Sequence, residues 1–287
     1  MLSEVFLVQH EGGVLYALKI LRASAAKDPR VQERFRREAQ LLEEWRHPNL
    51  IQGYGSIEVD GRLGLLLEYI TGPTLKDAGA GNPMGWEQVA RYGVQIARAL
   101  DKLHRGGALH RDVKPHNVLL DEKRGAILAD FGLVRRNTDP ELTRQGAALG
   151  SPAYMSPEQT KDPSGVGPAA DVYSLGATLH HALTGAPPFL GKGVGEVIHR
   201  VLHVDPEPLP DSLPEPLKKV MATAMAKDPE RRYQRARDLG GDLGRVLLGL
   251  SPNLLTRFRR KRRRRIAAAI TIVPLVLLGG EMIFDAV

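Results

Sequence analysis

The sequence reads His110-Arg111-Asp112-Val113-Lys114-Pro115-His116-Asn117 and, after a short strand-like run, Asp130-Phe131-Gly132. Two carboxylates, an ammonium and an amide thus lie close together along the chain. Transfer of a phosphoryl group from ATP needs a carboxylate aimed at the attacking hydroxyl, and further groups that hold Mg²⁺ against the phosphate oxygens. This pattern therefore predicts phosphoryl-transfer chemistry.

With these motifs the chain resembles the eukaryotic-like (Hanks-type) serine/threonine protein kinases, and more narrowly their membrane-anchored bacterial branch. The resemblance extends from Ser3 to about Leu250. It implies an α+β, bilobal protein-kinase fold, with a small β-rich N-lobe that lacks its first strand and a large, mainly helical C-lobe. The kinase domain would occupy residues 1–250: the N-lobe 1–67, the hinge 68–70 and the C-lobe 71–250.

The resemblance implies a role for each polar residue of the opening stretch. Asp112 would orient the acceptor hydroxyl or accept its proton, and Lys114 would neutralise charge on the γ-phosphoryl group. A lysine two residues after the aspartate favours Ser/Thr over Tyr as acceptor. Asn117 and Asp130 would bind Mg²⁺. His110 has a side chain that titrates near neutral pH, but the family favours a packing role over that of a general base.

ATP would lie between the lobes, with Lys19 on its α- and β-phosphates and Glu38 paired with Lys19. Glu38 belongs to an amphipathic helix that the sequence predicts before His47-Pro48. Leu67 would gate the adenine pocket, and hinge backbone would bind the adenine edge. The residues expected to bind ATP are Val5, Ala17, Lys19, Leu67, Glu68, Ile70 and Leu119.

Other matches concern regulation and architecture. Arg111, beside the catalytic aspartate, is expected to bind a phosphorylated residue of the activation segment, for which we choose Thr143. Glu158 is expected to form a buried ion pair with Arg232. Asp171 is expected to hold the backbone of the loop His110–Asn117, which is called the catalytic loop below.

The net charge of +7 comes from one basic run within residues 257–265, because the chain without that run is nearly neutral. An uncharged apolar stretch follows directly. Together they predict a basic juxtamembrane segment at 251–265 and a transmembrane helix at 266–284, with the kinase domain cytoplasmic at the cell inner membrane. A terminal core helix and a nucleic-acid-binding arm are the alternatives; we expect no nucleic acid partner. The chain has no cysteine, which excludes disulfides and thiolate chemistry.

The start of the chain bears on activity. Leu2 to Val8 matches only the end of the family's glycine-rich loop, so we expect a misplaced start or a fragment. The incomplete loop leaves a pseudokinase open as an alternative to an active enzyme. A small-molecule kinase of related fold is disfavoured, because the segment Gly150–Glu158 resembles the shelf on which protein kinases dock peptides. The resemblance also allows a homodimer.

Overall fold

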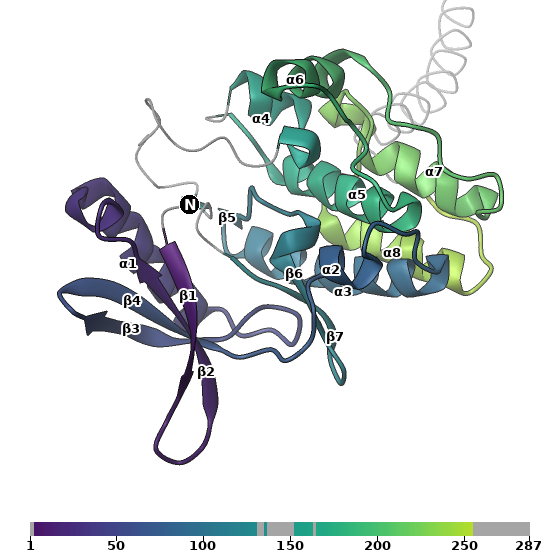
Figure 1. Cartoon of the computed structure of the whole chain (residues 1–287). Helices are drawn as coiled ribbons and strands as arrows, with labels where there is room; N and C mark the ends of the chain where they lie inside the picture. Colours follow the sequence, from purple (N-terminus) through teal and green to yellow (C-terminus); the bar gives the residue numbers. More distant parts are fainter. Residues whose placement is uncertain (1–2, 131–134, 137–151, 163–164, 255–287) are drawn as a thin grey trace, which may run out of the picture.

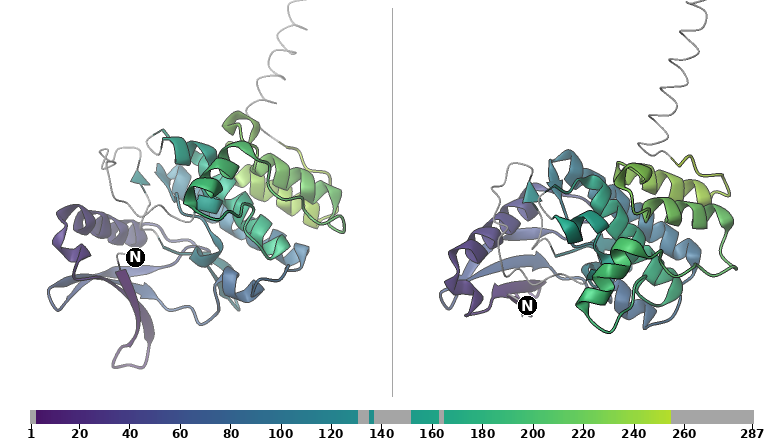
Figure 2. Two further views of the ribbon diagram at one scale, coloured as in Figure 1. Left: turned by 45° about the horizontal axis from the view of Figure 1, so that its top comes forward. Right: turned by 90° about the horizontal axis from the view of Figure 1, so that it is seen from above.

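Figure 1 shows the computed structural model, which describes residues 3–130, 135–136, 152–162 and 165–254. The described residues form two lobes. One consists of a twisted sheet with a single long helix, and the other is mainly helical (Figures 1 and 2). The predicted α+β, bilobal architecture is therefore confirmed for this part of the chain.

The small lobe begins at Ser3 and runs to the end of β4. Its elements are β1 (Ser3–Gln9), β2 (Leu15–Leu21), η1 (Ala25–Lys27), α1 (Pro29–Glu44), β3 (Gly53–Val59) and β4 (Arg62–Glu68). The four strands form an antiparallel sheet in the order β1-β2-β4-β3, so β2 and β4 are its central strands. Helix α1 packs on β3 and β4.

Helix α1 begins and packs as its sequence predicts. The side chain of Asp28 caps its first turn by accepting a hydrogen bond from the backbone N–H of Arg30, and proline occupies the first helical position. Phe35, Ala39 and Leu42 recur at the spacing of one helical face, and all three are buried. The face turned to the sheet is therefore the apolar one.

Helix α1 ends before His47-Pro48, as predicted. Its last residue is Glu44, and Trp45 has an extended backbone (φ −102°, ψ 92°). The indole ring of Trp45 is buried in the core. The chain therefore leaves the helix two residues ahead of His47.

The large lobe contains the remaining elements. They are α2 (Leu75–Gly79), α3 (Trp86–Arg105), β5 (Ala108–Leu109), η2 (Pro115–Asn117), β6 (Val118–Asp121), β7 (Gly125–Leu128), β8 (Arg135–Arg136), η3 (Pro152–Tyr154), α4 (Pro157–Lys161), α5 (Pro168–Thr184), α6 (Val194–His203), α7 (Glu215–Ala224), η4 (Pro229–Arg231) and α8 (Ala236–Leu247). Helix α3 packs against both α5 and α8, and the hairpin of β6 and β7 lies against α3 (Figure 1).

Helix α5 is the centre of the large lobe. Residues on every side of it are buried, including Val172, Tyr173 and Leu175, so it has no solvent face along most of its length. A helix buried all round must be enclosed by other elements. Helices α3, α7 and α8 enclose it, and its first turn carries Asp171 toward the catalytic loop.

Several predictions concern residues outside the described part. Thr143 is one of them, and so are the basic run and the apolar stretch at 266–284. Among the described helices, none has the length and apolar character required to cross a membrane.

Candidate active site

Residues predicted to bind ATP share one face of the small-lobe sheet. In the antiparallel register Val5 lies opposite Lys19, and Ala17 lies opposite both Leu7 and Leu67. Residues directly opposite each other, and residues two apart along a strand, point to the same side. Val5, Ala17, Lys19 and Leu67 therefore point to one side of the sheet, although they come from three strands.

Lys19 connects the two lobes on that side. Its Nζ lies 2.7 Å from Oε1 of Glu38 on α1 and 2.8 Å from Oδ1 of Asp130, which follows β7. Burial by itself would lower the pKa of Lys19, but the charges of Glu38 and Asp130 outweigh burial and raise that pKa above its ordinary value. Lys19 is therefore a permanent cation at the junction of β2, α1 and the segment after β7.

The catalytic loop holds three polar side chains together. Lys114 Nζ lies 2.7 Å from Oδ2 of Asp112, and the Nδ2 amide of Asn117 donates to the same oxygen at 2.9 Å. Asn117 also donates to the backbone carbonyl of Asp112 at 2.8 Å. These contacts are possible because η2 turns the chain back between Lys114 and Val118. The carboxylate of Asp112 is thus fixed by two donors.

The carboxylate of Asp171 holds the backbone of the catalytic loop through hydrogen bonds. Its Oδ1 accepts from the backbone N–H of Arg111 at 2.7 Å, and its Oδ2 accepts from the N–H of His110 at 2.9 Å. Oδ2 also lies 2.8 Å from Nε2 of His104, at the end of α3. Burial alone would raise the pKa of Asp171, but these hydrogen bonds and the nearby histidines lower it. Arg111 adopts a left-handed backbone (φ 66°), so the loop conformation depends on these contacts.

His110 is fully buried behind the loop. Its Nε2 lies 3.2 Å from the carbonyl oxygen of Ala129, and its Nδ1 accepts from the N–H of Asp112 at 3.4 Å. Burial lowers the pKa of His110, which keeps the ring neutral near pH 7. Both nitrogens are therefore used within the protein, in keeping with the packing role expected for this histidine.

The residues predicted to surround adenine at the hinge differ in their contacts. The backbone N–H of Glu68 donates to the carbonyl of Gln52 at 2.9 Å. The side chain of Ile70 is buried in the core. Leu119, on β6, is partly buried against the core, and its backbone pairs with that of Thr74 in a single antiparallel β-bridge. The sequence did not predict the direction of the Glu68 carboxylate, which points to Arg124 in the turn after β6.

The predicted ion pair of the large lobe is present. Arg232 Nη1 lies 2.6 Å from Oε1 of Glu158, and Nη2 lies 2.9 Å from Oε2. Arg232 has no exposed surface. Its guanidinium also lies over the ring of Tyr173, 4.8 Å from the centroid. The ion pair thus connects α4, which carries Glu158, to the segment before α8, which carries Arg232, and it packs against Tyr173 of α5.

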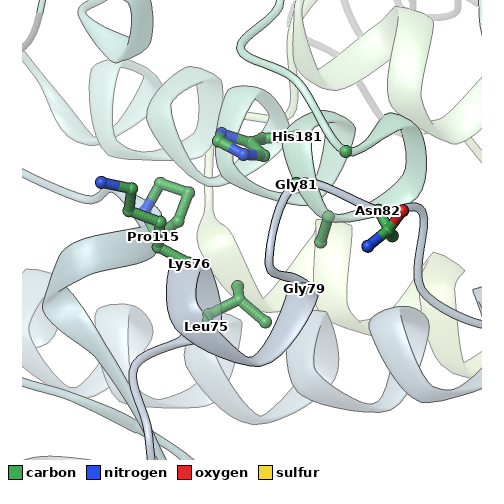
Figure 3. Close-up of a pocket in the computed structure, with 9 residues that line it drawn as sticks. Leu75, Lys76, Gly79, Gly81, Asn82, Pro115 and His181 are labelled. Carbon is green, nitrogen blue, oxygen red and sulfur yellow. The ribbon is translucent and has the colours of Figure 1, made fainter.

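A small pocket lies beside the catalytic loop. It is lined by α2 and the residues after it, by Pro115 in η2 and by the end of α5, and its lining includes Lys76 and His181 (Figure 3). His181 Nδ1 lies 2.6 Å from the hydroxyl of Tyr154, and the two rings are stacked. This contact holds η3, which belongs to the predicted peptide shelf, against α5.

The donor set fits a magnesium ion. Asn117 offers an amide oxygen and Asp130 a carboxylate, and hard cations such as Mg²⁺ take oxygen ligands. No group of three or more His, Cys, Asp or Glu that could hold a metal occurs within the described residues. A site with one carboxylate and one amide suits Mg²⁺, which is commonly bound by few protein groups together with substrate phosphates.

Two contacts of this site were missed by the sequence analysis. His104 binds Asp171, and Arg124 binds Glu68. The partners are separated by 67 and 56 residues, respectively. No local pattern links residues so far apart, so they are revealed only by tertiary packing: of α3 against α5 within the large lobe for His104, and of the two lobes against each other for Arg124.

The chain belongs to the protein kinase domain family, which matches residues 1–239. It is 37% identical over 245 residues to serine/threonine-protein kinase PknB of Mycobacterium leprae, covering 82% of this chain and 39% of that protein. It is 36% identical over 227 residues to serine/threonine-protein kinase PknH of Mycobacterium bovis, covering 78% of this chain and 38% of that protein. The family predicted from the sequence is thereby confirmed. The chain spans about two fifths of the length of these curated relatives.

Proposed function

We propose that the chain is a serine/threonine protein kinase that transfers the γ-phosphoryl group of ATP to hydroxyls of proteins. The observation that supports this most strongly is the position of Lys19, within 2.8 Å of both Glu38 and Asp130. A lysine held between a helix of one lobe and the metal-binding segment of the other is the arrangement that kinase chemistry requires.

In this proposal the acceptor oxygen attacks the γ-phosphorus, the bond to the ADP oxygen breaks, and the hydroxyl proton passes to Asp112. Lys114 already contacts the Asp112 carboxylate at 2.7 Å, so its charge lies where the transferring group would sit. Lys19 would contact the α- and β-phosphates. Asn117 and Asp130 would hold Mg²⁺, which neutralises phosphate charge when bound.

Adenine would bind against the sheet face that carries Val5, Ala17 and Leu67, with Leu119 on its other side. Backbone groups of Glu68 and Ile70 would bind its edge. The Tyr154–His181 contact holds η3, which belongs to the segment that resembles the peptide-docking shelf, against α5, and this supports a peptide acceptor over a small molecule.

Phosphotransfer by the full-length chain tests the proposal. The chain, purified in detergent, is incubated with labelled ATP, Mg²⁺ and casein. Asp112→Asn should lower incorporation by at least about 10²-fold, because a general base contributes that much. Asp60→Asn makes the same chemical change at an exposed turn and should leave the rate unchanged. Equal label in wild type and Asp112→Asn would contradict the proposal, and nucleotide binding without transfer would favour a pseudokinase.

We also propose activation by phosphorylation of Thr143, which lies outside the described residues, with Arg111 as the cation that binds the phosphate. Mass spectrometry of the autophosphorylated chain should find label on Thr143 that Asp112→Asn lacks.

Residues 266–284 are proposed to anchor the chain in the inner membrane, with the kinase domain in the cytoplasm. A chain that stays in the supernatant after membranes are sedimented would contradict the anchor.

A further inference from the structure

The back of the hinge carries an ion pair between the lobes. Glu68 is the last residue of β4, and its carboxylate faces Arg124 in the turn between β6 and β7. Arg124 Nη2 lies 2.7 Å from Oε2 of Glu68, and Nη1 lies 3.3 Å from Oε1. The backbone N–H of Gln52 donates to Oε1 at 2.8 Å. A two-pronged contact of this kind fixes direction as well as distance.

Arg124 is itself held by residues other than Glu68. Its backbone N–H donates to Oδ1 of Asp121 at 2.7 Å. Its carbonyl accepts from Gln95 Nε2 on α3 at 3.0 Å and from Asn49 Nδ2, in the small-lobe segment between α1 and β3, at 3.2 Å. These bonds fix the turn from both lobes without any help from Glu68. The ion pair therefore transmits the position of this turn to the end of β4.

The end of β4 is where the nucleotide is expected to bind. The backbone N–H of Glu68 donates to the carbonyl of Gln52, so the main chain and the side chain of Glu68 are both fixed on the side of Gln52 and Arg124. The proposed adenine contacts come from the backbone of residues 68–70. A change in the direction of the Glu68 side chain would therefore move the groups that bind adenine.

We propose that Arg124 is a positioning residue for ATP: it holds Glu68, and through Glu68 the hinge backbone, at the place where adenine binds. This inference rests on the proposed kinase function. The side chains of Glu68 and Arg124 are 14% and 32% exposed, so water only partly screens the pair. Its loss should therefore be followed in nucleotide binding and in thermal stability together.

The test measures binding of a fluorescent ATP analogue, with Mg²⁺, to the full-length chain carrying Asp112→Asn, so that no turnover occurs. Arg124→Ala should raise the Kd at least about fivefold, the lower range of coupling between sites. Lys123→Ala removes a neighbouring cation in the same turn whose side chain is exposed, and should change the Kd less than about twofold. Thermal unfolding of both variants shows that each is folded.

Two further variants separate positioning from a general structural effect. Arg124→Lys keeps one charged contact and should give an intermediate Kd. In a Glu68→Gln background, Arg124→Ala should add little, because the two residues act through one contact. In the catalytically intact chain, Arg124→Ala should raise the KM for ATP more than it lowers kcat.

The two proposals can fail separately. A wild-type chain that binds nucleotide but does not phosphorylate casein contradicts the proposed function alone. An Arg124→Ala chain that binds nucleotide as tightly as wild type, or an equal loss in Lys123→Ala, overturns the positioning role. Additive losses in Glu68→Gln and Arg124→Ala would overturn it as well.

Discussion

Arg232 shows how one buried charge can be satisfied completely. A guanidinium has five N–H donors. Those of Arg232 contact both oxygens of Glu158 and the backbone carbonyls of Ala169, Ala226 and Lys227. Removal of the cation would leave Glu158 and the three carbonyls without these donors, and unpaired buried groups are costly.

Arg232→Met should therefore destabilise the chain by about 3 to 5 kcal/mol, the usual cost of breaking a buried pair. Arg232→Lys should recover only part of this, since an ammonium cannot match both oxygens of Glu158 in parallel. Urea unfolding followed by tryptophan fluorescence measures the difference. The neighbouring Arg231 has an exposed side chain, and Arg231→Met should cost no more than about 0.5 kcal/mol. Equal losses at both positions would contradict this account.

Individual residues were predictable where a short motif fixes their chemistry. Lys19, Asp112, Asn117 and Asp130 come from such motifs, and the structure brings Lys19 and Asp130 into contact although they are 111 residues apart. Arg124 has no motif, because its role depends on which side chain of the other lobe lies opposite a turn. The catalytic and metal-binding roles of Lys19, Asp112, Asn117 and Asp130 stay predictions until the chemistry is measured.

Among the elements, the linker after the hinge is the most tightly fitted. Gly72 passes so close to β6 that a Cβ at this position would lie 1.6 Å from the carbonyl oxygen of Leu120 and 2.8 Å from its carbonyl carbon. The backbone of β6 cannot move freely, because Leu120 donates its N–H to the carbonyl of Pro73 and pairs with Ala126 on β7. Position 72 therefore requires glycine, because the linker backbone approaches the Leu120 carbonyl too closely for a Cβ atom.

Gly72→Ala should accordingly separate the linker from β6 and destabilise the chain by about 3 kcal/mol or more, the upper range for overpacking. Gly85 precedes α3, and a Cβ there would meet no atom within 4 Å. Gly85→Ala is therefore the matched control and should cost no more than about 1 kcal/mol, the usual loss when alanine replaces a favourable N-cap residue. Thermal unfolding of the two variants makes the comparison. A Gly72→Ala chain as stable as Gly85→Ala would show that the linker can move away at little cost.

At the level of whole elements, the family resemblance implied the small β-rich lobe and the large, mainly helical lobe, and the described residues contain both. Helix ends were less predictable: the sequence places the end of α1 only before His47-Pro48, and the helix ends at Glu44. Periodicity reports which face of an element is buried, whereas helix ends fray and are defined only to within one or two residues.

For the whole molecule, buried histidines determine how stability responds to pH. Burial lowers the pKa of His110, His180 and His181 below the ordinary value of 6.5. The unfolded chain takes up protons on these side chains as the pH falls through 6.5, whereas the folded chain does not. Stability must therefore decrease as the pH falls below about 6.5. The lowered pKa of Asp171 acts in the same direction, but only near and below its ordinary value of 3.8.

The midpoint of thermal unfolding should therefore be lower at pH 5.0 than at pH 7.5, and the histidines should account for the change in this window. His180→Gln tests their share, because a glutamine amide can still donate to the carbonyl of Glu207, which lies 2.8 Å from His180 Nε2, but cannot titrate. The fall in midpoint between pH 7.5 and 5.0 should be smaller in this variant than in wild type. His10→Gln, at an exposed position, should leave the fall as it is. A midpoint that stays constant or rises on acidification would contradict this account, because groups whose pKa is raised in the folded chain would then dominate the proton balance between pH 7.5 and 5.0.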